Sequence, residues 1–169
     1  NRTFDYQWNR YDIETKDGQQ VGNVNWTTAG TAPATEPEIK ALQQFMYTRN
    51  MAALVTLHTG IQSVLYPWCY RAYDENNPDD AEIPFMKDTA AEMAQAFQNY
   101  TGRGFYSMSS NEDYPTAAEL IDYAYGRYNI HAYTIEVYSP GKSEDGDISS
   151  CKWENTMPEA KWVFYSRDE

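Results

Sequence analysis

The spacing of hydrophobic positions along the chain predicts alternating helices and strands. Helices are predicted where apolar residues recur every three or four positions, in residues 35–50, 84–102 and 114–128. Strands are predicted for residues 51–60, 104–110 and 130–138, and residues 63–70 form a strand or an extended segment. This alternation indicates an α/β fold with a mixed, mostly parallel central sheet flanked by helices.

Polar residues at the helix ends supply further signals. Thr35 and Glu38 have the spacing of a capping box, and Thr116 and Glu119 repeat that spacing before the last predicted helix. Gly102 follows the second predicted helix, and glycine ends helices readily because it adopts a left-handed conformation at little cost. We therefore expect two capped helices and one helix that ends at glycine.

The remaining segments differ in their patterns. The run at 51–60 is continuously apolar, which is typical of a strand buried on both faces of a parallel sheet. Residues 1–34 are rich in Asn, Gly, Asp and Thr, so we expect a long surface excursion there. Residues 139–158 have the composition of a mobile loop, and residues 159–165 predict a short strand or turn.

The strand at 130–138 contains a carboxylate that calls for an explanation. Its alternation places Glu136 on the same face as Ala132 and Thr134. A buried and unpaired carboxylate is costly, so Glu136 needs either a partner or a function. A structural ion pair with Arg127 or Lys161 is the simpler explanation.

A histidine occupies a related position at the end of another predicted strand. His58 closes the apolar run that precedes it, and Glu136 lies late in its own strand. In open α/β sheets, ligands bind at the carboxyl ends of the strands. A histidine at a strand end is more often structural than functional, but the two residues together indicate a shared site.

Composition limits the classes of function. A chain of 169 residues with 41% hydrophobic residues can form one domain with a core. Its net charge of −12 argues against nucleic acids and anionic membranes as partners, and no apolar run reaches the roughly 20 residues of a membrane helix. The two cysteines, Cys69 and Cys151, allow one disulfide or two free thiols.

Several short motifs occur in a recognisable order: NR, TEPE, LVTLHT with LYPW, a tyrosine before IDYAYG, and AYTIEV. With this order the chain resembles the catalytic domain of the zinc carboxypeptidases, the metallopeptidases of the carboxypeptidase A and T type. The resemblance extends from Asn1 to about residue 138, without a gap between Tyr114 and Glu136, and is loose over residues 139–169. It implies that residues 1–169 are the C-terminal portion of a single catalytic domain.

The resemblance assigns catalytic roles to two residues. His58 matches the third zinc ligand, and Glu136 matches the general base that takes a proton from a zinc-bound water. The family takes two further zinc ligands and an arginine from an upstream segment, and these motifs are not in this chain. Because a catalytic zinc needs three protein ligands, we expect the isolated chain to bind zinc weakly and to lack peptidase activity.

The resemblance also assigns substrate-binding roles, to Asn1, Arg2, Thr59, Tyr114, Ile121 and Thr134. Asn1 and Arg2 match the pair that holds the substrate's terminal carboxylate, and a guanidinium suits that task because it binds carboxylates with two hydrogen bonds. Tyr114 matches a mobile tyrosine that closes over the substrate.

Three further positions belong to the implied specificity pocket or to the wall of the substrate site. Ile121 matches the pocket floor, and an apolar floor favours hydrophobic C-terminal residues. Glu119 is either a helix-capping residue or an acidic group that accepts Lys or Arg side chains. Gly60 replaces an aromatic residue of many relatives, so we expect a more open wall at that point.

The function implied is that of a secreted zinc-dependent exopeptidase, a hydrolase that removes C-terminal residues from peptides and proteins. Its expected partners are peptide C-termini and the missing N-terminal portion of the same domain. One alternative is a metal-free peptide-binding module or an inactive fragment of such an enzyme. A second alternative is a carboxypeptidase acting on peptidoglycan stem peptides.

Overall fold

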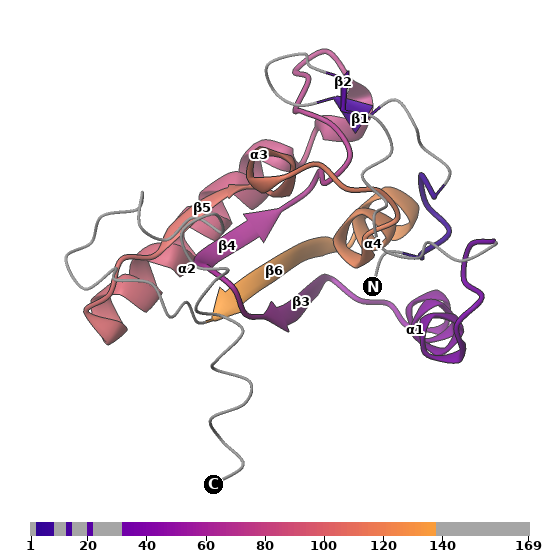
Figure 1. Cartoon of the computed structure of the whole chain (residues 1–169), viewed down its shortest axis with the longest axis horizontal. Helices are drawn as coiled ribbons and strands as arrows, with labels where there is room; N and C mark the ends of the chain where they lie inside the picture. Colours follow the sequence, from indigo (N-terminus) through magenta and orange to yellow (C-terminus); the bar gives the residue numbers. More distant parts are fainter. Residues whose placement is uncertain (1–2, 9–12, 15–19, 22–31, 138–169) are drawn as a thin grey trace, which may run out of the picture.

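The computed structural model describes residues 3–8, 13–14, 20–21 and 32–137. Its central sheet has four strands in the order β3 (Ala53–His58), β6 (His131–Val137), β4 (Gln62–Tyr66) and β5 (Tyr106–Ser109). The β3–β6 and β4–β5 pairs are parallel, and β4 pairs with β6 in antiparallel fashion. The predicted mixed, mostly parallel sheet is confirmed. A separate antiparallel ladder joins β1 (Ile13–Glu14) to β2 (Gln20–Val21) (Figure 1).

Helices flank both faces of this sheet. They are α1 (Pro37–Thr48), the 3-10 turn η1 (Pro78–Asp80), α2 (Ile83–Thr101), the single turn α3 (Ser110–Asp113) and α4 (Leu120–Tyr128). The helix that was expected to end at Gly102 does so, with that glycine left-handed at φ 68°. No helix of the described part is long and apolar enough to cross a membrane.

The core is divided between the two faces of the sheet. On one face the long helix α2 packs on β4 and β6, through Val64, Tyr66, Tyr133, Ile135, Ile83, Met86, Ala90 and Ala94. On the other face α4 and α1 pack around Ala132 and Ile130, with Leu120, Ile121, Tyr123, Ala124, Ile39 and Met46. The alternation read from the sequence of β6 is therefore confirmed, because Tyr133 and Ala132 belong to opposite cores.

The beginning of the chain contributes to the second core. Phe4 is fully buried, its ring centroid lies 5.3 Å from that of Tyr123, and its N–H donates to the carbonyl of Ala118 at 3.1 Å. The expected surface excursion is therefore wrong at this point. A single apolar residue among polar ones gave no periodic signal, and only contacts distant in sequence bury it.

Both expected capping boxes are wrong. The N-cap residues are Glu36 for α1 and Glu119 for α4, and neither side chain bonds to a backbone N–H of its helix. Thr35 donates to the Glu36 carboxylate at 2.8 Å, and Thr116 donates to the Glu119 carboxylate at 3.0 Å. The threonines therefore bind side chains of neighbouring residues, which a four-residue pattern cannot distinguish from capping.

The strand β3 lies at the edge of the described sheet, and it is not buried on both faces as expected. Alternate residues of β3 are exposed, with Val55 at 50% and Leu57 at 68% of their full accessibility. They lie on the sheet face that α2 covers elsewhere, because they pair with Tyr133 and Ile135. An apolar edge strand of this kind is a surface for pairing with another segment.

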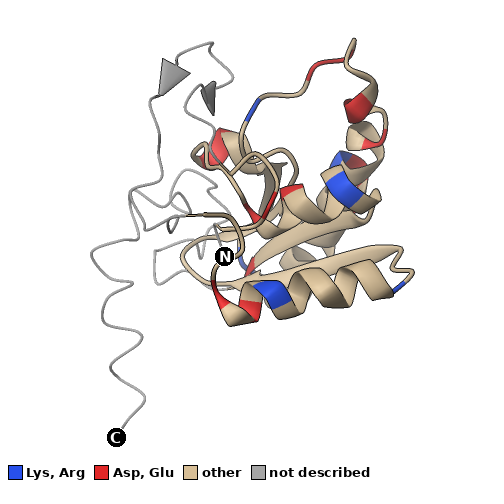
Figure 2. Cartoon of the chain, turned by 90° about the vertical axis from the view of Figure 1, so that its right-hand side faces the viewer, with Lys and Arg blue, Asp and Glu red and all other residues tan. Residues whose placement is uncertain are grey.

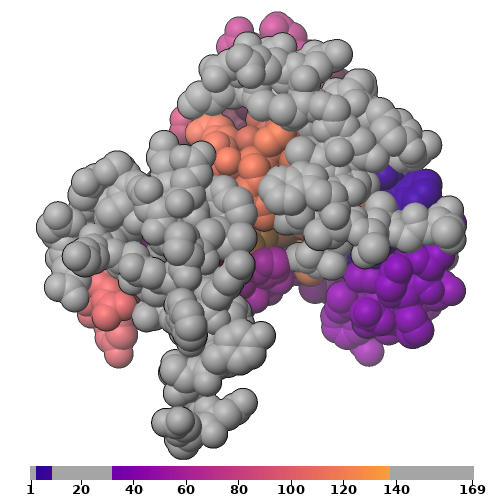
Figure 3. Space-filling view, viewed as in Figure 1, coloured from indigo at the N-terminus to yellow at the C-terminus, as the bar shows by residue number. Residues whose placement is uncertain are grey.

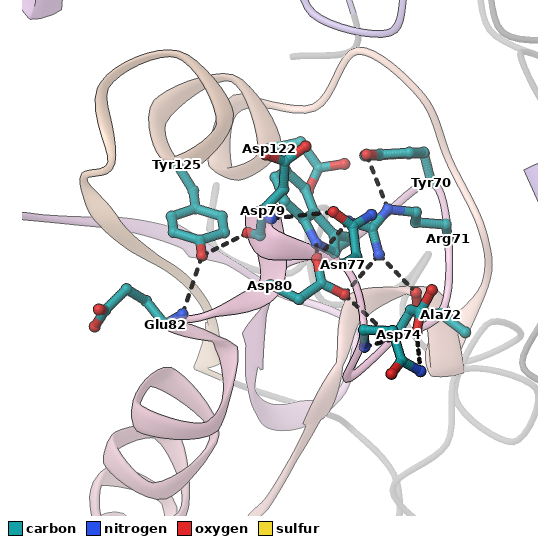
Figure 4. Close-up of polar contacts among 12 residues, drawn as sticks. Tyr70, Arg71, Ala72, Asp74, Asn77, Asp79, Asp80, Glu82, Asp122 and Tyr125 are labelled. Atoms are coloured by element: carbon teal, nitrogen blue, oxygen red, sulfur yellow. Dashed lines mark hydrogen bonds and ion pairs between the residues drawn. The ribbon is translucent and has the colours of Figure 1, made fainter.

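A buried ionic network holds the connection between β4 and α2 (Figure 4). The Asp80 carboxylate accepts hydrogen bonds from Trp68 Nε1 at 2.6 Å, from the Asp74 N–H at 2.7 Å and from both terminal nitrogens of Arg71. The Arg71 guanidinium also lies over the Trp68 ring, 4.9 Å from its centroid. Tyr125 of α4 donates to the carbonyl of Asp79 at 2.8 Å and so joins this connection to α4.

Candidate active site

Three polar side chains form a row across neighbouring strands, at the carboxyl ends of β3 and β6. Glu136 pairs with His58 of β3 on one side and with Ser63 of β4 on the other. Directly paired residues share a face of the sheet, so the three side chains point the same way. His58 Nδ1 lies 3.7 Å from Glu136 Oε1. His58 and Glu136 therefore lie side by side, as their positions at strand ends predicted.

Glu136 is poorly solvated, and among the described residues it has no strong partner. Its side chain is 14% exposed, and Oε2 is buried without a hydrogen-bond partner in the described part of the chain. Burial raises the pKa of Glu136 to about 7, and the charges of Asp113 and Glu119 act in the same direction. A carboxylate with a pKa near neutrality suits proton transfer at physiological pH.

The structural ion pair considered for Glu136 is not formed with Arg127. That arginine donates to the carbonyl of Asp5 at 2.8 Å and pairs with the Asp5 carboxylate at 3.9 Å. Lys161 lies outside the described residues. Arg127 therefore does not explain the burial of Glu136.

The structure describes four of the other expected substrate-binding residues. Thr134 precedes Glu136 by two residues on the same face, and Thr59 follows His58 in an exposed position. Tyr114 ends α3 in a half-buried position, and Ile121 is buried in the first turn of α4. Asn1 and Arg2 lie outside the described residues. In the space-filling view the orange segment between α3 and α4 occupies the centre of one face (Figure 3).

A buried aspartate that the sequence did not single out lies in the first turn of α4. Asp122 of α4 is fully buried, and both of its carboxylate oxygens accept from the N–H of Cys69, at 2.9 and 3.0 Å. Burial raises the pKa of Asp122 to about 7 although these bonds favour the charged form. Cys69 is a free, buried thiol, and burial raises the pKa of this thiol well above its ordinary value. A charged residue inside the apolar run 120–125 was the signal available in the sequence.

Asp122 makes the stability of the fold sensitive to pH. Its pKa is higher in the folded chain than in the unfolded chain, so the unfolded state loses a proton first as the pH rises from about 4 to about 7. Stability is therefore expected to fall over this range. Asp122→Asn should reduce the loss between pH 4.5 and pH 7.5 by about 2–4 kcal/mol, measured by urea unfolding.

The raised pKa of Glu136 also lowers the free energy of unfolding as the pH rises. The Asp122→Asn chain should therefore keep part of the dependence of stability on pH. Glu136→Gln is the matched control. It should remove the contribution of Glu136 to the pH dependence of the unfolding free energy and leave the contribution of Asp122. Equal slopes in the wild-type and Asp122→Asn chains would contradict the raised pKa of Asp122.

The described residues do not provide a complete zinc site. They contain no group of three His, Cys, Asp or Glu side chains that could hold a metal ion. A catalytic zinc needs three protein ligands and one open position, and His58 could supply one of them. Acidic residues are spread over several elements of the described part instead of gathering around one point (Figure 2).

Comparison with known proteins identifies the family of this chain. The model of the zinc carboxypeptidase family matches residues 1–157, so the chain belongs to the zinc carboxypeptidase family. It is 30% identical to carboxypeptidase B of Homo sapiens over 148 residues, and this match covers 84% of this chain and 32% of that protein. It is 28% identical to carboxypeptidase O of Bos taurus over 143 residues, and this match covers 83% of this chain and 36% of that protein.

Solved structures show the same fold. The crystal structure of thrombin activatable fibrinolysis inhibitor matches with a TM-score of 0.61 at 19% identity, over 95% of this chain and 40% of that one. Carboxypeptidase A from Helicoverpa armigera matches with a TM-score of 0.60 at 20% identity, over 100% of this chain and 42% of that one. The chain thus spans about a third of the length of these curated relatives and about two fifths of these structures.

Proposed function

We propose that residues 1–169 form the C-terminal portion of a zinc-dependent carboxypeptidase domain that removes the last residue of peptides or proteins. The observation that carries this proposal is the contact between His58 and the buried Glu136, at the carboxyl ends of two parallel strands. Family membership supplies the class of reaction. The complete enzyme would comprise this chain and the part of the domain that its relatives have and this chain does not span.

Glu136 is proposed to move the proton in this reaction. Its Oε2 is buried and has no partner in the described part, so it is available to accept a proton from the attacking water. The same carboxyl would then donate that proton to the leaving amine. Arg2 and Asn1 are proposed to bind the substrate's terminal carboxylate, and Tyr114, Thr59 and Thr134 to contact the substrate.

The exposed edge strand β3 is a surface on which the rest of the domain could pack. Val55 and Leu57 are apolar and exposed on the outermost strand of the described sheet. A strand that added to this edge in parallel would end beside His58. We propose that the remaining part of the domain packs here and brings two further zinc ligands to His58.

The isolated chain is expected to retain zinc at well below one equivalent and to show no carboxypeptidase activity, because His58 alone cannot hold a catalytic zinc. Metal analysis after dialysis of the purified, folded chain measures the first quantity, with a His58→Ala chain as the matched control. One equivalent of zinc that is lost in His58→Ala would contradict this expectation and would identify ligands within residues 1–169.

A metal-free binding module is the second candidate function, and the incomplete zinc site among the described residues favours it. Such a module would bind peptide C-termini with no turnover. Titration of the complete protein with an N-blocked peptide, in buffer that supplies zinc, separates the two: hydrolysis supports the enzyme, and binding without turnover supports the module. We also propose that the protein is secreted, and that peptidoglycan stem peptides are an alternative class of substrate. Ile121 supports a preference for an aliphatic or aromatic side chain at the substrate's C-terminus.

A further inference from the structure

The last turn of α2 contains an acceptor tripeptide for N-linked carbohydrate. Asn99, Tyr100 and Thr101 form the pattern Asn-X-Ser/Thr, with a residue other than proline in the middle. Two further tripeptides of this pattern begin at Asn1 and Asn25, which lie outside the described residues. Such a short pattern also arises by chance, so the surroundings of Asn99 decide whether it can be used.

All three residues of the tripeptide are exposed. Tyr100 keeps 92% of its full accessibility, and Asn99 and Thr101 are exposed on either side of it. Gln95 Nε2 donates to Asn99 Oδ1 at 2.9 Å, so this contact uses the oxygen of the amide and not the nitrogen that carries a sugar. An attached carbohydrate is bulky and must stand in solvent, and the position of Asn99 meets this requirement.

The threonine of the tripeptide also has a structural role at the helix end. α2 ends at Thr101, whose hydroxyl donates to the carbonyl of Phe97 at 2.7 Å and accepts from the N–H of Arg103 at 3.2 Å. Neither contact involves the side chain of Asn99. Asn99→Gln therefore removes the acceptor and leaves these contacts in place.

An apolar hollow borders the tripeptide. It has a volume of about 290 Å³, and its lining includes Phe97, Tyr100, Phe105 and Val137. Val137 is 44% exposed and Tyr100 is almost fully exposed, so large apolar side chains meet solvent here. Exposed apolar surface favours association between molecules. A hydrophilic sugar chain on Asn99 would stand beside this surface and keep it soluble.

The tripeptide lies away from the proposed active site and from the edge strand β3. Val137 belongs to the sheet face that α2 covers, and Glu136, its neighbour in β6, points to the opposite face. α2 packs on β4 and β5, at the other side of the sheet from β3. In Figure 1 the C-terminal end of α2 projects at the left, whereas α1 and α4 lie at the right. A sugar chain on Asn99 therefore obstructs neither the catalytic row nor the surface proposed for the rest of the domain.

We propose that Asn99 is a site of N-glycosylation, an inference that rests on the proposed secretion of the protein. Asn99 Nδ2 forms a bond to the anomeric carbon of the first N-acetylglucosamine of an oligosaccharide that is carried on a lipid diphosphate. The bond from that carbon to the diphosphate oxygen breaks, and the lipid diphosphate leaves with the bonding electron pair. The amide nitrogen gives up one of its two protons. The transfer takes place on the emerging chain, before α2 forms.

The test produces the complete protein from its own coding sequence in a eukaryotic cell and collects it from the medium. A peptide N-glycosidase in heavy-oxygen water converts a glycosylated asparagine into a labelled aspartate, and mass spectrometry of the peptides then identifies its position. We expect the label at residue 99. The glycosylated peptide should be absent from Asn99→Gln and Thr101→Ala and present in Thr101→Ser.

Asn76→Gln is the matched control for the loss of an exposed asparagine. Asn76 is exposed, but Asn77 and Pro78 follow it, so it does not begin an acceptor tripeptide. This variant should keep the label at residue 99. If a variant is not recovered from the medium, the label in the wild-type protein decides the inference.

The outcomes separate this inference from the functions proposed above. A secreted protein whose peptide contains unmodified Asn99 would overturn the inference and leave both the secretion and the carboxypeptidase function intact. A protein found only in the cytosol, without carbohydrate, would overturn the inference together with the proposed secretion. A glycosylated protein that cleaves no peptide would support the inference and contradict only the carboxypeptidase function.

Discussion

Replacing Asp80 with alanine is expected to lower the free energy of unfolding by about 3–5 kcal/mol. The Asp80 carboxylate is almost completely buried and accepts from Trp68, Arg71 and the N–H of Asp74. Its removal leaves the half-buried Arg71 guanidinium and the Trp68 N–H without their acceptor, and unsatisfied buried groups carry the full cost of desolvation. Urea unfolding followed by tryptophan fluorescence measures the change.

Asp79→Ala is the matched control for this substitution. Asp79 is the exposed neighbour, and its hydrogen bonds with Tyr125 and Asn77 use its backbone carbonyl and its backbone N–H, which alanine keeps. We expect its substitution to change stability by less than about 0.5 kcal/mol. A similar effect of both substitutions would show that the loop, and not the buried carboxylate, determines stability here.

Asp80 also determines how this stability responds to acid. Burial alone would raise its pKa, but hydrogen bonds from Arg71, Asp74 and Trp68 outweigh burial and hold the pKa of Asp80 below its ordinary value. A lowered pKa in the folded state stabilises the fold above the pKa of the unfolded chain, and this stabilisation is lost as the pH falls through the folded value. The effect of Asp80→Ala should therefore be largest near neutral pH and smaller in strong acid.

Replacing Glu136 with glutamine in the complete enzyme is expected to lower kcat by about 10²–10⁴, the usual contribution of a general base. Glutamine keeps the shape of the side chain but cannot accept the proton of the attacking water. KM should change little, because substrate binding is assigned to other residues. Steady-state kinetics on an N-blocked peptide measures both constants.

Glu92→Gln, on the exposed surface of α2, is the control for the loss of one negative charge, and its kcat should equal that of the wild type. A Glu136→Gln enzyme that retains kcat within about threefold would exclude Glu136 as the general base, because a missing base costs at least about 10² in rate. Its unfolding free energy should not fall, since the carboxylate it replaces has no strong partner in the described part.

Local patterns predicted the elements that depend on local physics. Gly102 ended its helix as expected, and the alternation around Glu136 gave the correct faces of β6. The contact between His58 and Glu136 followed from a general property of α/β sheets, that strands of one direction end at one edge. These signals are periodic or depend on a few neighbouring residues, so one sequence is enough to detect them.

The remainder depends on contacts between distant segments. Phe4 and Asp122 are buried by elements far away in sequence, and neither has a periodic signal. The exposure of Val55 and Leu57 was missed because an apolar strand has the same sequence whether or not a neighbour covers it. Ser63 escaped notice for a similar reason, since only the register of β4 against β6 places it opposite Glu136.

The most direct test of the proposed function is the release of free amino acids from an N-blocked peptide by the complete enzyme, before and after zinc is removed with a chelator. We predict that mass spectrometry will show residues leaving one at a time from the C-terminus, that release stops without zinc, and that added zinc restores it. Release that persists without metal, or no release by a folded enzyme that holds one zinc ion, would contradict the proposed function.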